Sequence, residues 1–558
     1  MTIDVDAVLA QMTLEEKVGQ MFLLAFAGSQ LRAAEHLVRQ QGVGGCYLSQ
    51  DNAATPAEAA ALSATLQQFA RATRLALPLL LGADHEGVWG VMVPFSATGP
   101  GNLALGAARV PDLTRRMYRV LGAELAAVGY NTLLAPCADV NTNPHNPIIG
   151  TRSFGEDPAQ VATLVRAAVE GAREAGVVTT VKHFPGHGDT VVDSHRGLPR
   201  VDRSRAELEA TDLRPFRAAI AAGVDIVMTS HILYPALDPA QPATLSRIIL
   251  EEVLRGALGF EGVILSDSMN MGAMRQHYTP EEAAIRAVLA GVDVLMLAEE
   301  HYDHDAATYL EKQLRCIDGV IRAVRDGRIP QARIDTAVRR VLTLKARQPL
   351  VADPPTVLAP EAVGRAEHRA IEREAAAAGV TLVRDARHLL PLPAHERVVL
   401  VNATPRASYA VLQQTRGIGP NQAVPAFDVF ADRLRAVRPT IETLSHEAVA
   451  AGGLPPELNA GGTVLVVTEQ YPLPGSDFDT AAQHAVVAQL LALVGDRLAV
   501  IALRDPYELA QFPQVGTYLC TCSSRPCAAE AAADVVVGRR PALGTLPVSV
   551  PGAPGDNP

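Results

Sequence analysis

Between residues 10 and 345, eight short apolar runs alternate with amphipathic stretches. The runs lie at 21–26, 43–48, 78–83, 131–135, 176–182, 225–230, 262–266 and 293–297. Each run is continuously apolar, which is typical of strands buried on both faces of a parallel sheet. Helical spacing marks 111–127, 158–174, 204–222 and 280–290, and Pro111, Pro158 and Pro280 stand at plausible helix starts. The pattern therefore predicts an α/β fold in which strands and helices alternate.

Eight parallel strands are the number that closes a (β/α)₈ barrel of the TIM type. A doubly wound open sheet would produce the same alternation, so the pattern leaves both architectures open. The chain has 558 residues, which leaves room for a second domain because a barrel uses roughly 250 residues or more.

A second domain is indicated by a cluster of prolines between residues 346 and 362, which is typical of a linker. A helical pattern follows around 362–378. New apolar runs then lie at 379–384, 397–402, 463–468 and 498–503, and 541–552 has the composition of an extended segment. We predict a (β/α)₈ barrel domain over 1–347, a linker and helix over 348–378, and a smaller α/β sandwich domain over 379–558.

The composition argues against several partners. The net charge is −11 with a pI near 5.8, and without a basic cluster neither nucleic acid nor an anionic membrane is a favourable partner. No apolar run approaches the ~20 residues of a membrane span, and the N-terminus lacks a signal-peptide pattern. Six cysteines are too few for a disulfide scaffold in a chain of this size. We expect a cytoplasmic protein, and its oligomeric state stays open.

Polar side chains follow five of the predicted strands. They are Asp84-His85-Glu86, Lys182-His183, His231, Asp267 and Glu299-Glu300. In barrel enzymes the reactive groups lie where strands end and loops begin. Because all five sets follow strand ends, we expect them to meet at one rim and form an active site.

Asp267 ends the apolar run at 262–266. An aspartate there could cap a helix or form a turn, because Asp favours both positions. At a barrel rim it could instead attack an anomeric carbon and form a glycosyl-enzyme intermediate.

Asp193 and His195 lie two residues apart in a glycine-containing loop. A histidine held by a carboxylate forms a general acid/base unit, because the carboxylate fixes the tautomer and stabilises the imidazolium. A solvated loop pair is the alternative interpretation.

The same loop also suggests a metal site, since four potential ligands are near in sequence: His183, His187, Asp189 and His195. Pro185 and Gly186 break any helix there, so the histidines cannot form the helical pair of a zinc protease. We predict no metal and no organic cofactor.

Two cations flank the predicted rim. Only four of the 49 basic residues are lysines, and Lys182 leaves a buried strand, where a solvated charge is rare. Arg152 follows the fourth strand after a loop and could be a surface arginine or part of the rim.

These segments resemble glycoside hydrolase family 3, and within it the β-N-acetylglucosaminidase branch. The resemblance is carried by 182–190 (KHFPGHGDT), followed by 193–195 (DSH), and is supported by 146–158 and 266–271. It covers the barrel strongly, and 389–392 and 544–548 are similar to the sandwich domain of two-domain members.

The resemblance implies that Asp267 is the nucleophile and that His195, paired with Asp193, is the acid/base. It implies that the sugar is bound by Asp84, Arg152, Lys182 and His183. One segment departs from the family pattern. The family usually reads Asp-Gln-Glu-Gly-Gly with an arginine eight residues after the Asp, whereas this chain reads DHEGV over 84–88 and has Met92 in the place of the arginine. A sugar contact is therefore missing from its usual place.

The resulting hypothesis is a retaining exo-β-N-acetylglucosaminidase. It would release terminal β-linked GlcNAc from small peptidoglycan- or chitin-derived fragments. Three alternatives stay open: a β-N-acetylglucosaminide phosphorylase, a family 3 β-glucosidase, and a barrel that only binds sugar.

Overall fold

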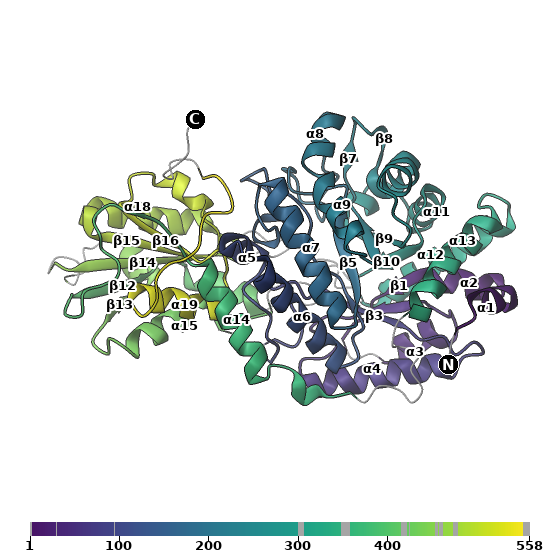
Figure 1. The fold of residues 1–558 in the computed structure, drawn as a ribbon, viewed down its shortest axis with the longest axis horizontal. Coiled ribbons are helices and arrows are strands. Elements are labelled where there is room, and N and C mark those ends of the chain that lie inside the picture. The colour runs from purple at the N-terminus through teal and green to yellow at the C-terminus, as the bar shows by residue number, and fades with distance from the viewer. Residues whose placement is uncertain are drawn as a thin grey trace.

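The computed structural model describes residues 3–28, 31–93, 95–298, 306–347, 358–413, 421–422, 424–451, 456, 461–471 and 478–550. A barrel formed by the N-terminal part of the chain lies beside a second α/β unit formed by the C-terminal part (Figure 1). No helix within these residues is both long and apolar enough to cross a membrane.

The first unit is a closed barrel of parallel strands in the order β1-β10-β9-β6-β5-β4-β3-β2. The strands are β1 Phe22–Leu24, β2 Gly45–Tyr47, β3 Leu80–Ala83, β4 Thr132–Leu133, β5 Val178–Phe184, β6 Ile226–Thr229, β9 Val263–Ser268 and β10 Val294–Leu297. All eight predicted strands are confirmed. Because β1 pairs with both β2 and β10, the sheet has no free edge, and the open doubly wound alternative was wrong.

Helices surround the barrel (Figure 1). They are α1 Val5–Gln11, α2 Leu14–Gln20, α3 Leu31–Arg39, α4 Pro56–Arg71, α5 Asn102–Ala108, α6 Pro111–Ala127, α7 Pro158–Glu174, α8 Arg205–Ala210, α9 Leu213–Ala221, a π-helix Ile248–Ala257, α10 Gly272–Arg275, α11 Pro280–Ala290, α12 Ala306–Arg325 and α13 Gln331–Arg347. The prolines at 111, 158 and 280 each begin a helix, as predicted. The predicted helix 204–222 is divided into α8 and α9. Pro215 lacks an N–H group and is tolerated only in a first turn, so a new helix begins at Leu213.

A two-stranded hairpin, β7 Leu233–Tyr234 and β8 Asp238–Pro242, follows β6 and was not predicted. β8 contains two prolines, which lack the N–H group needed for strand pairing, so the sequence did not indicate a strand there. The hairpin leads into a 3-10 helix, Ala243–Leu245, that brings Thr244 back to the end of β6.

The second unit is a six-stranded sheet in the order β11-β16-β15-β14-β12-β13. Its strands are β11 Thr381–Asp385, β12 Val398–Asn402, β13 Glu442–Leu444, β14 Thr463–Glu469, β15 Leu498–Leu503 and β16 Thr517–Cys520. Only β11 is antiparallel. The four predicted strands are confirmed. The short edge strand β13 and the four-residue β16 were missed, because runs this short resemble loop sequence.

Helices cover both faces of this sheet (Figure 1). They are α14 Ala366–Gly379, α15 Ala426–Arg435, α16 His446–Ala450, α18 Thr480–Val494 and α19 Pro526–Val536. Successive residues of β12 belong to different cores: Val399 and Val401 to one, Val398 and Leu400 to the other. The sheet is therefore the middle layer of a sandwich, as predicted.

Further 3-10 helices lie at Gly150–Arg152, Pro360–Ala362, Arg406–Gln413, Gly495–Arg497 and Tyr507–Gln511. Residues of α5, which belongs to the barrel chain segment, pack into one core of the second unit through Leu103, Ala104 and Ala107. The domain bounds at 347 and 378 stay a prediction, since the proline-rich segment 348–357 lies outside the described residues.

Candidate active site

Lys182 and Asp84 meet at the carboxyl end of the barrel strands, as the sequence predicts. Lys182 lies in β5 and is 1% exposed, and its ammonium group donates to Asp84, which follows β3. Glu86 lies 3.6 Å from the same ammonium nitrogen, and the Tyr47 hydroxyl donates to Asp84 at 2.9 Å. Burial alone would lower the pKa of Lys182, but the carboxylates of Asp84 and Glu86 raise it. The lysine is therefore a fixed cation.

Arg152 also belongs to this rim and is not a surface arginine, since it is 2% exposed. Its Nε donates to Glu86 Oε1 at 3.0 Å, and its guanidinium carbon lies 3.8 Å from the centre of the Trp89 ring. Burial opposes the charge, but nearby acids, Glu86 first, raise the pKa of the guanidinium. The turn that follows β3 therefore orients both Lys182 and Arg152.

Asp139 organises the loop after β4 and was missed by the sequence analysis. Its Oδ1 accepts from the backbone N–H groups of His183 and His187 at 3.1 and 2.7 Å, and its Oδ2 accepts from His183 Nδ1 at 2.8 Å. Cys137 donates its S–H to the same oxygen at 2.8 Å. Its position shortly after β4 at the barrel rim is the sequence signal that could have found it.

His183 is buried beside cations and stays neutral. Burial first, then the charge of Arg152, lower the pKa of His183 well below its ordinary value. Because Nδ1 donates to Asp139, Nε2 is the unprotonated nitrogen, and it lies 3.5 Å from Arg152 Nη2. This nitrogen can therefore accept a hydrogen bond.

One group of possible metal ligands occurs in the described residues: Cys137, Asp139 and His183. The hydrogen bonds just described join all three side chains, with the carboxylate accepting from the thiol and the ring. His187 uses its ring nitrogens on Thr190 and Ser194, at 2.9 and 3.0 Å. The geometry gives both histidines hydrogen-bonding roles.

The structure joins Asp193 and His195 as a dyad. His195 Nδ1 lies 2.7 Å from Asp193 Oδ1, which also accepts from the His195 backbone N–H at 2.9 Å. Both residues are largely buried. A solvated loop pair was therefore the wrong interpretation of this motif, and the ring is held with Nε2 directed away from the carboxylate.

Asp267 lies near the carboxyl end of β9, half-buried, with Oδ1 accepting from the Ser268 N–H at 2.7 Å. Burial tends to raise its pKa. The pKa of Asp267 nevertheless lies below the ordinary value, and the hydrogen bond from the Ser268 amide is one cause. The carboxylate is therefore ionised at neutral pH, as a nucleophile requires.

His231 supports the end of β9 from the neighbouring strand. Its Nε2 lies 2.9 Å from the carbonyl oxygen of Ser268, and its Nδ1 lies 2.8 Å from Thr244 Oγ1. Nε2 therefore donates and Nδ1 accepts. Burial lowers the pKa of His231, which keeps it neutral.

The loop carrying the dyad is joined to the segment after Asp267. Gly272 N–H donates to the His195 carbonyl at 3.1 Å, and Ala273 N–H donates to the Ser194 carbonyl at 3.0 Å. A Cβ atom at position 272 would lie 2.3 Å from the His195 carbonyl oxygen. Only glycine permits this approach.

We therefore predict that Gly272→Ala lowers kcat/KM for glycoside hydrolysis by about 100-fold, because it displaces His195, the expected acid/base, and a shift of ~1 Å in such a group costs roughly that factor. The control is Gly197→Ala, in the same loop, where the nearest atom would be a Val192 methyl carbon at an ordinary 3.7 Å. Steady-state kinetics of both variants checks this. Equal activity of the two variants would contradict it.

Three further residues that the sequence analysis singled out are Met92, Glu299 and Glu300. Met92 is fully buried and packs in the barrel core. Glu299 and Glu300 lie outside the described residues.

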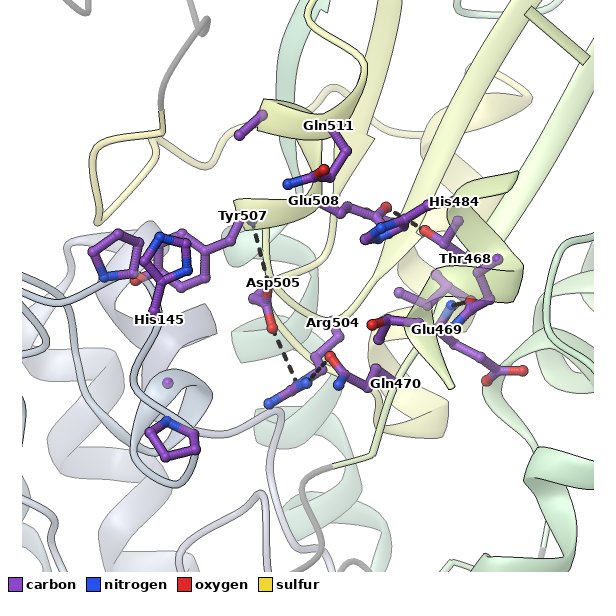
Figure 2. A pocket seen from close by; sticks show the side chains of 18 of the residues that line it. His145, Thr468, Glu469, Gln470, His484, Arg504, Asp505, Tyr507, Glu508 and Gln511 are labelled. Atoms are coloured by element: carbon purple, nitrogen blue, oxygen red, sulfur yellow. Dashed lines mark hydrogen bonds and ion pairs between the residues drawn. The ribbon is translucent and has the colours of Figure 1, made fainter. Parts of the chain in front are cut away.

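A cavity of about 460 Å³ lies between the two units and was not anticipated (Figure 2). The barrel side is formed by the loop 144–150, and the other side by the carboxyl ends of β14 and β15. Glu469 and Glu508 line it. Burial raises the pKa of Glu469 to about 7 and that of Glu508 to about 8. These carboxyl groups are protonated or partly protonated at neutral pH.

This protonation makes stability pH-dependent. A carboxyl group whose pKa is raised on folding contributes stability that is complete below its ordinary pKa and is lost as the pH rises through the folded value.

Glu508 accepts from the Thr468 hydroxyl, and Glu508→Gln keeps an acceptor oxygen that cannot ionise. We expect Glu508→Gln to have the higher Tm at about pH 9 and a smaller fall in Tm between about pH 6 and 9. Calorimetry checks this, with the exposed Glu261→Gln as control, and parallel curves for wild type and Glu508→Gln would refute it.

Comparison with known proteins agrees with this architecture. The family model described as the glycosyl hydrolase family 3 N-terminal domain matches residues 13–344. Beta-hexosaminidase A of Pseudoalteromonas piscicida is 31% identical over 92% of this chain and 90% of its own length. The beta-N-acetylglucosaminidase/beta-glucosidase of Cellulomonas fimi is 31% identical over 97% of this chain and 94% of its own.

Among solved structures, a glycoside hydrolase family 3 β-N-acetylglucosaminidase from Paenibacillus sp. str. FPU-7 superposes with a TM-score of 0.84 at 34% identity. The superposition covers 96% of this chain and 99% of that one. The resemblance inferred from the motifs is thereby confirmed, and the chain belongs to glycosyl hydrolase family 3.

Proposed function

We propose that the protein is a retaining exo-β-N-acetylglucosaminidase with Asp267 as nucleophile and His195 as acid/base. The observation that carries the proposal is the buried Asp193–His195 dyad, whose loop is hydrogen-bonded to the segment that follows Asp267. An ionised carboxylate and a carboxylate-held imidazole are the two groups that double displacement requires.

In the first step, Asp267 forms a bond to the anomeric carbon while the bond to the leaving oxygen breaks. The imidazolium of His195 gives its Nε2 proton to that oxygen, so the leaving group departs as an alcohol. Asp193 stabilises the imidazolium through Nδ1, at 2.7 Å.

In the second step, neutral His195 removes a proton from water at Nε2, and the water oxygen attacks the anomeric carbon. The glycosyl–Asp267 bond breaks, the carboxylate is restored and the sugar leaves with its original configuration. His195 is again an imidazolium, so protons balance over the cycle.

Asp84, Lys182, Arg152 and His183 are proposed to bind the hydroxyl groups of the terminal sugar. All four are buried and already hydrogen-bonded to one another or to Glu86 and Asp139. Their geometry is therefore set before the sugar arrives, which reduces the entropy lost on binding.

The activity is tested with para-nitrophenyl N-acetyl-β-glucosaminide and para-nitrophenyl β-glucoside, each with and without phosphate. We expect preference for the N-acetyl sugar and no dependence on phosphate. Preference for the glucoside would make the protein a β-glucosidase, an activity named for the Cellulomonas fimi relative. Sugar phosphate as product would make it a phosphorylase, and binding without turnover would leave a sugar-binding barrel.

The natural substrates are proposed to be small chitin- or peptidoglycan-derived fragments, which di- and trisaccharide assays would test. A cytoplasmic location is proposed because all six cysteines are free and buried thiols. Fractionation of the producing cells tests that location.

A further inference from the structure

One turn of the barrel supports both cations of the proposed sugar site. It comprises residues 84–91, after β3, and includes Asp84, Glu86 and Trp89, which contact Lys182 and Arg152. Within the turn, the Glu86 N–H donates to the Trp89 carbonyl at 2.9 Å. The position of this turn therefore sets the position of both cations.

The turn is held from outside by an arginine of the second unit. Arg525 precedes α19 and is 2% exposed. Its Nε donates to the Gly87 carbonyl, and its Nη2 donates to the Val88 carbonyl at 2.9 Å. Asn421 donates from Nδ2 to the Gly90 carbonyl at 2.8 Å. Three carbonyl groups of one barrel turn thus accept hydrogen bonds from residues more than 300 positions away.

Arg525 also affects the electrostatics of the turn. Its own burial is unfavourable for charge and lowers its pKa to about 10. Burial first, and the charge of Arg525 acting against Glu124, lower the pKa of His85 to about 4. His85 is therefore neutral, and its Nδ1 accepts from the Val91 N–H at 3.2 Å, which closes the turn.

The chemistry of arginine suits this task. A guanidinium group can donate to two carbonyl oxygens from fixed positions, whereas an ammonium group is a compact point charge without the planar fork. Burial of such a cation without partners is strongly unfavourable. Hydrogen bonds to two backbone dipoles offset part of that cost, so Arg525 and the turn stabilise each other.

The residue that stands where the family usually has an arginine, Met92, follows this turn directly. Met92 is fully buried and packs in the barrel core. The cation that contacts this segment comes from the second unit, at Arg525, and it contacts the backbone.

We propose that Arg525 is a positioning residue of the active site, which makes the second unit a required part of the sugar-binding site. This inference rests on the proposed function of the rim in binding a sugar. Arg525 acts through the turn 84–91: it fixes the carbonyl groups of the turn, and the turn fixes Lys182 and Arg152.

The test compares Arg525→Met and Arg525→Lys with wild type, using whichever glycoside the wild type hydrolyses. The comparison therefore stays valid even if the preferred sugar is not N-acetylglucosamine. We expect Arg525→Met to raise KM by about 10- to 100-fold, with a smaller effect on kcat, because ground-state sugar contacts are displaced. Arg525→Lys should recover part of this loss. The pH profile of kcat should not change, because the dyad is not disturbed.

Arg438→Met is the matched control, since Arg438 also donates to backbone carbonyls, those of Leu392, Pro393 and Glu396, but wholly within the second unit. It should lower Tm without raising KM. Hydrogen exchange gives a readout independent of activity: amides of 84–93 should exchange faster in Arg525→Met than in Arg438→Met.

An unchanged KM in Arg525→Met would overturn the inference. Equal effects of Arg525→Met and Arg438→Met on KM and on hydrogen exchange would also overturn it. Where Arg525→Met does not fold, the inference is decided on Arg525→Lys by the same two measurements. A wild-type KM and wild-type exchange in that variant would then overturn it.

Discussion

Asp267→Asn is expected to lower kcat by about 10⁴-fold or more, since removing a nucleophile eliminates the covalent pathway rather than weakening it. The structure gives the reason for so large an effect. The Asp267 carboxylate accepts from the Ser268 N–H and has a pKa below its ordinary value, so it is ionised. An amide neither attacks carbon nor stabilises an oxocarbenium-like transition state. KM should change far less than kcat.

Small external anions should partly restore turnover when the side chain is shortened. In Asp267→Gly, azide can occupy the space of the carboxylate and attack the anomeric carbon from the same face. One displacement in place of two gives the α-glycosyl azide, which NMR distinguishes from the β-configured hydrolysis product. A β-configured azide, or a kcat within tenfold of wild type, would rule out Asp267 as nucleophile.

Asp225→Asn is the matched control for this experiment. Asp225 is a carboxylate just before β6, at the opposite end of the barrel, and it accepts from the Thr179 N–H at 3.0 Å. Its replacement should alter Tm but leave kcat within about twofold, because surface and structural changes away from the site do not affect transition-state contacts.

His195→Ala is expected to lower kcat/KM for a substrate with a poor leaving group by about 10²- to 10⁴-fold, the usual contribution of general acid catalysis. For a dinitrophenyl glycoside the first step needs no proton, so the loss there should be much smaller. The second step still lacks its base. The glycosyl-enzyme should therefore accumulate and appear as a burst of dinitrophenol.

Asp193→Asn separates the two roles of the dyad. The amide oxygen can still accept from the ring and the backbone of His195, but it no longer stabilises the imidazolium. Without the Asp193 charge, the His195 imidazolium loses its proton at lower pH. Because this imidazolium is the proposed acid, the alkaline limb of the activity profile should move to lower pH. An unchanged limb and an equal loss for both leaving groups would exclude the dyad as acid/base. His446→Ala, remote in the second unit, is the control.

Much of the architecture could be predicted from the sequence, because local patterns determine it. Continuous apolar runs identified every barrel strand, and prolines identified the starts of three helices. Closure of the barrel was a different matter: the pairing of β1 with β10 joins residues more than 270 positions apart, and no local pattern distinguishes a closed sheet from an open one.

The same distinction holds within the site. Asp267 and Lys182 could be proposed from their positions at strand ends, and His195 from its place beside Asp193 in the loop after β5, since those positions follow from the order of the chain. The hydrogen bonds of Asp139 to His183, of Gly272 to His195 and of Arg525 to the 84–91 turn could not. The sequence by itself determined which chemical groups lie at the rim. Only the tertiary structure decided how those groups are oriented, because hydrogen bonds between distant segments depend on packing that residue order does not encode.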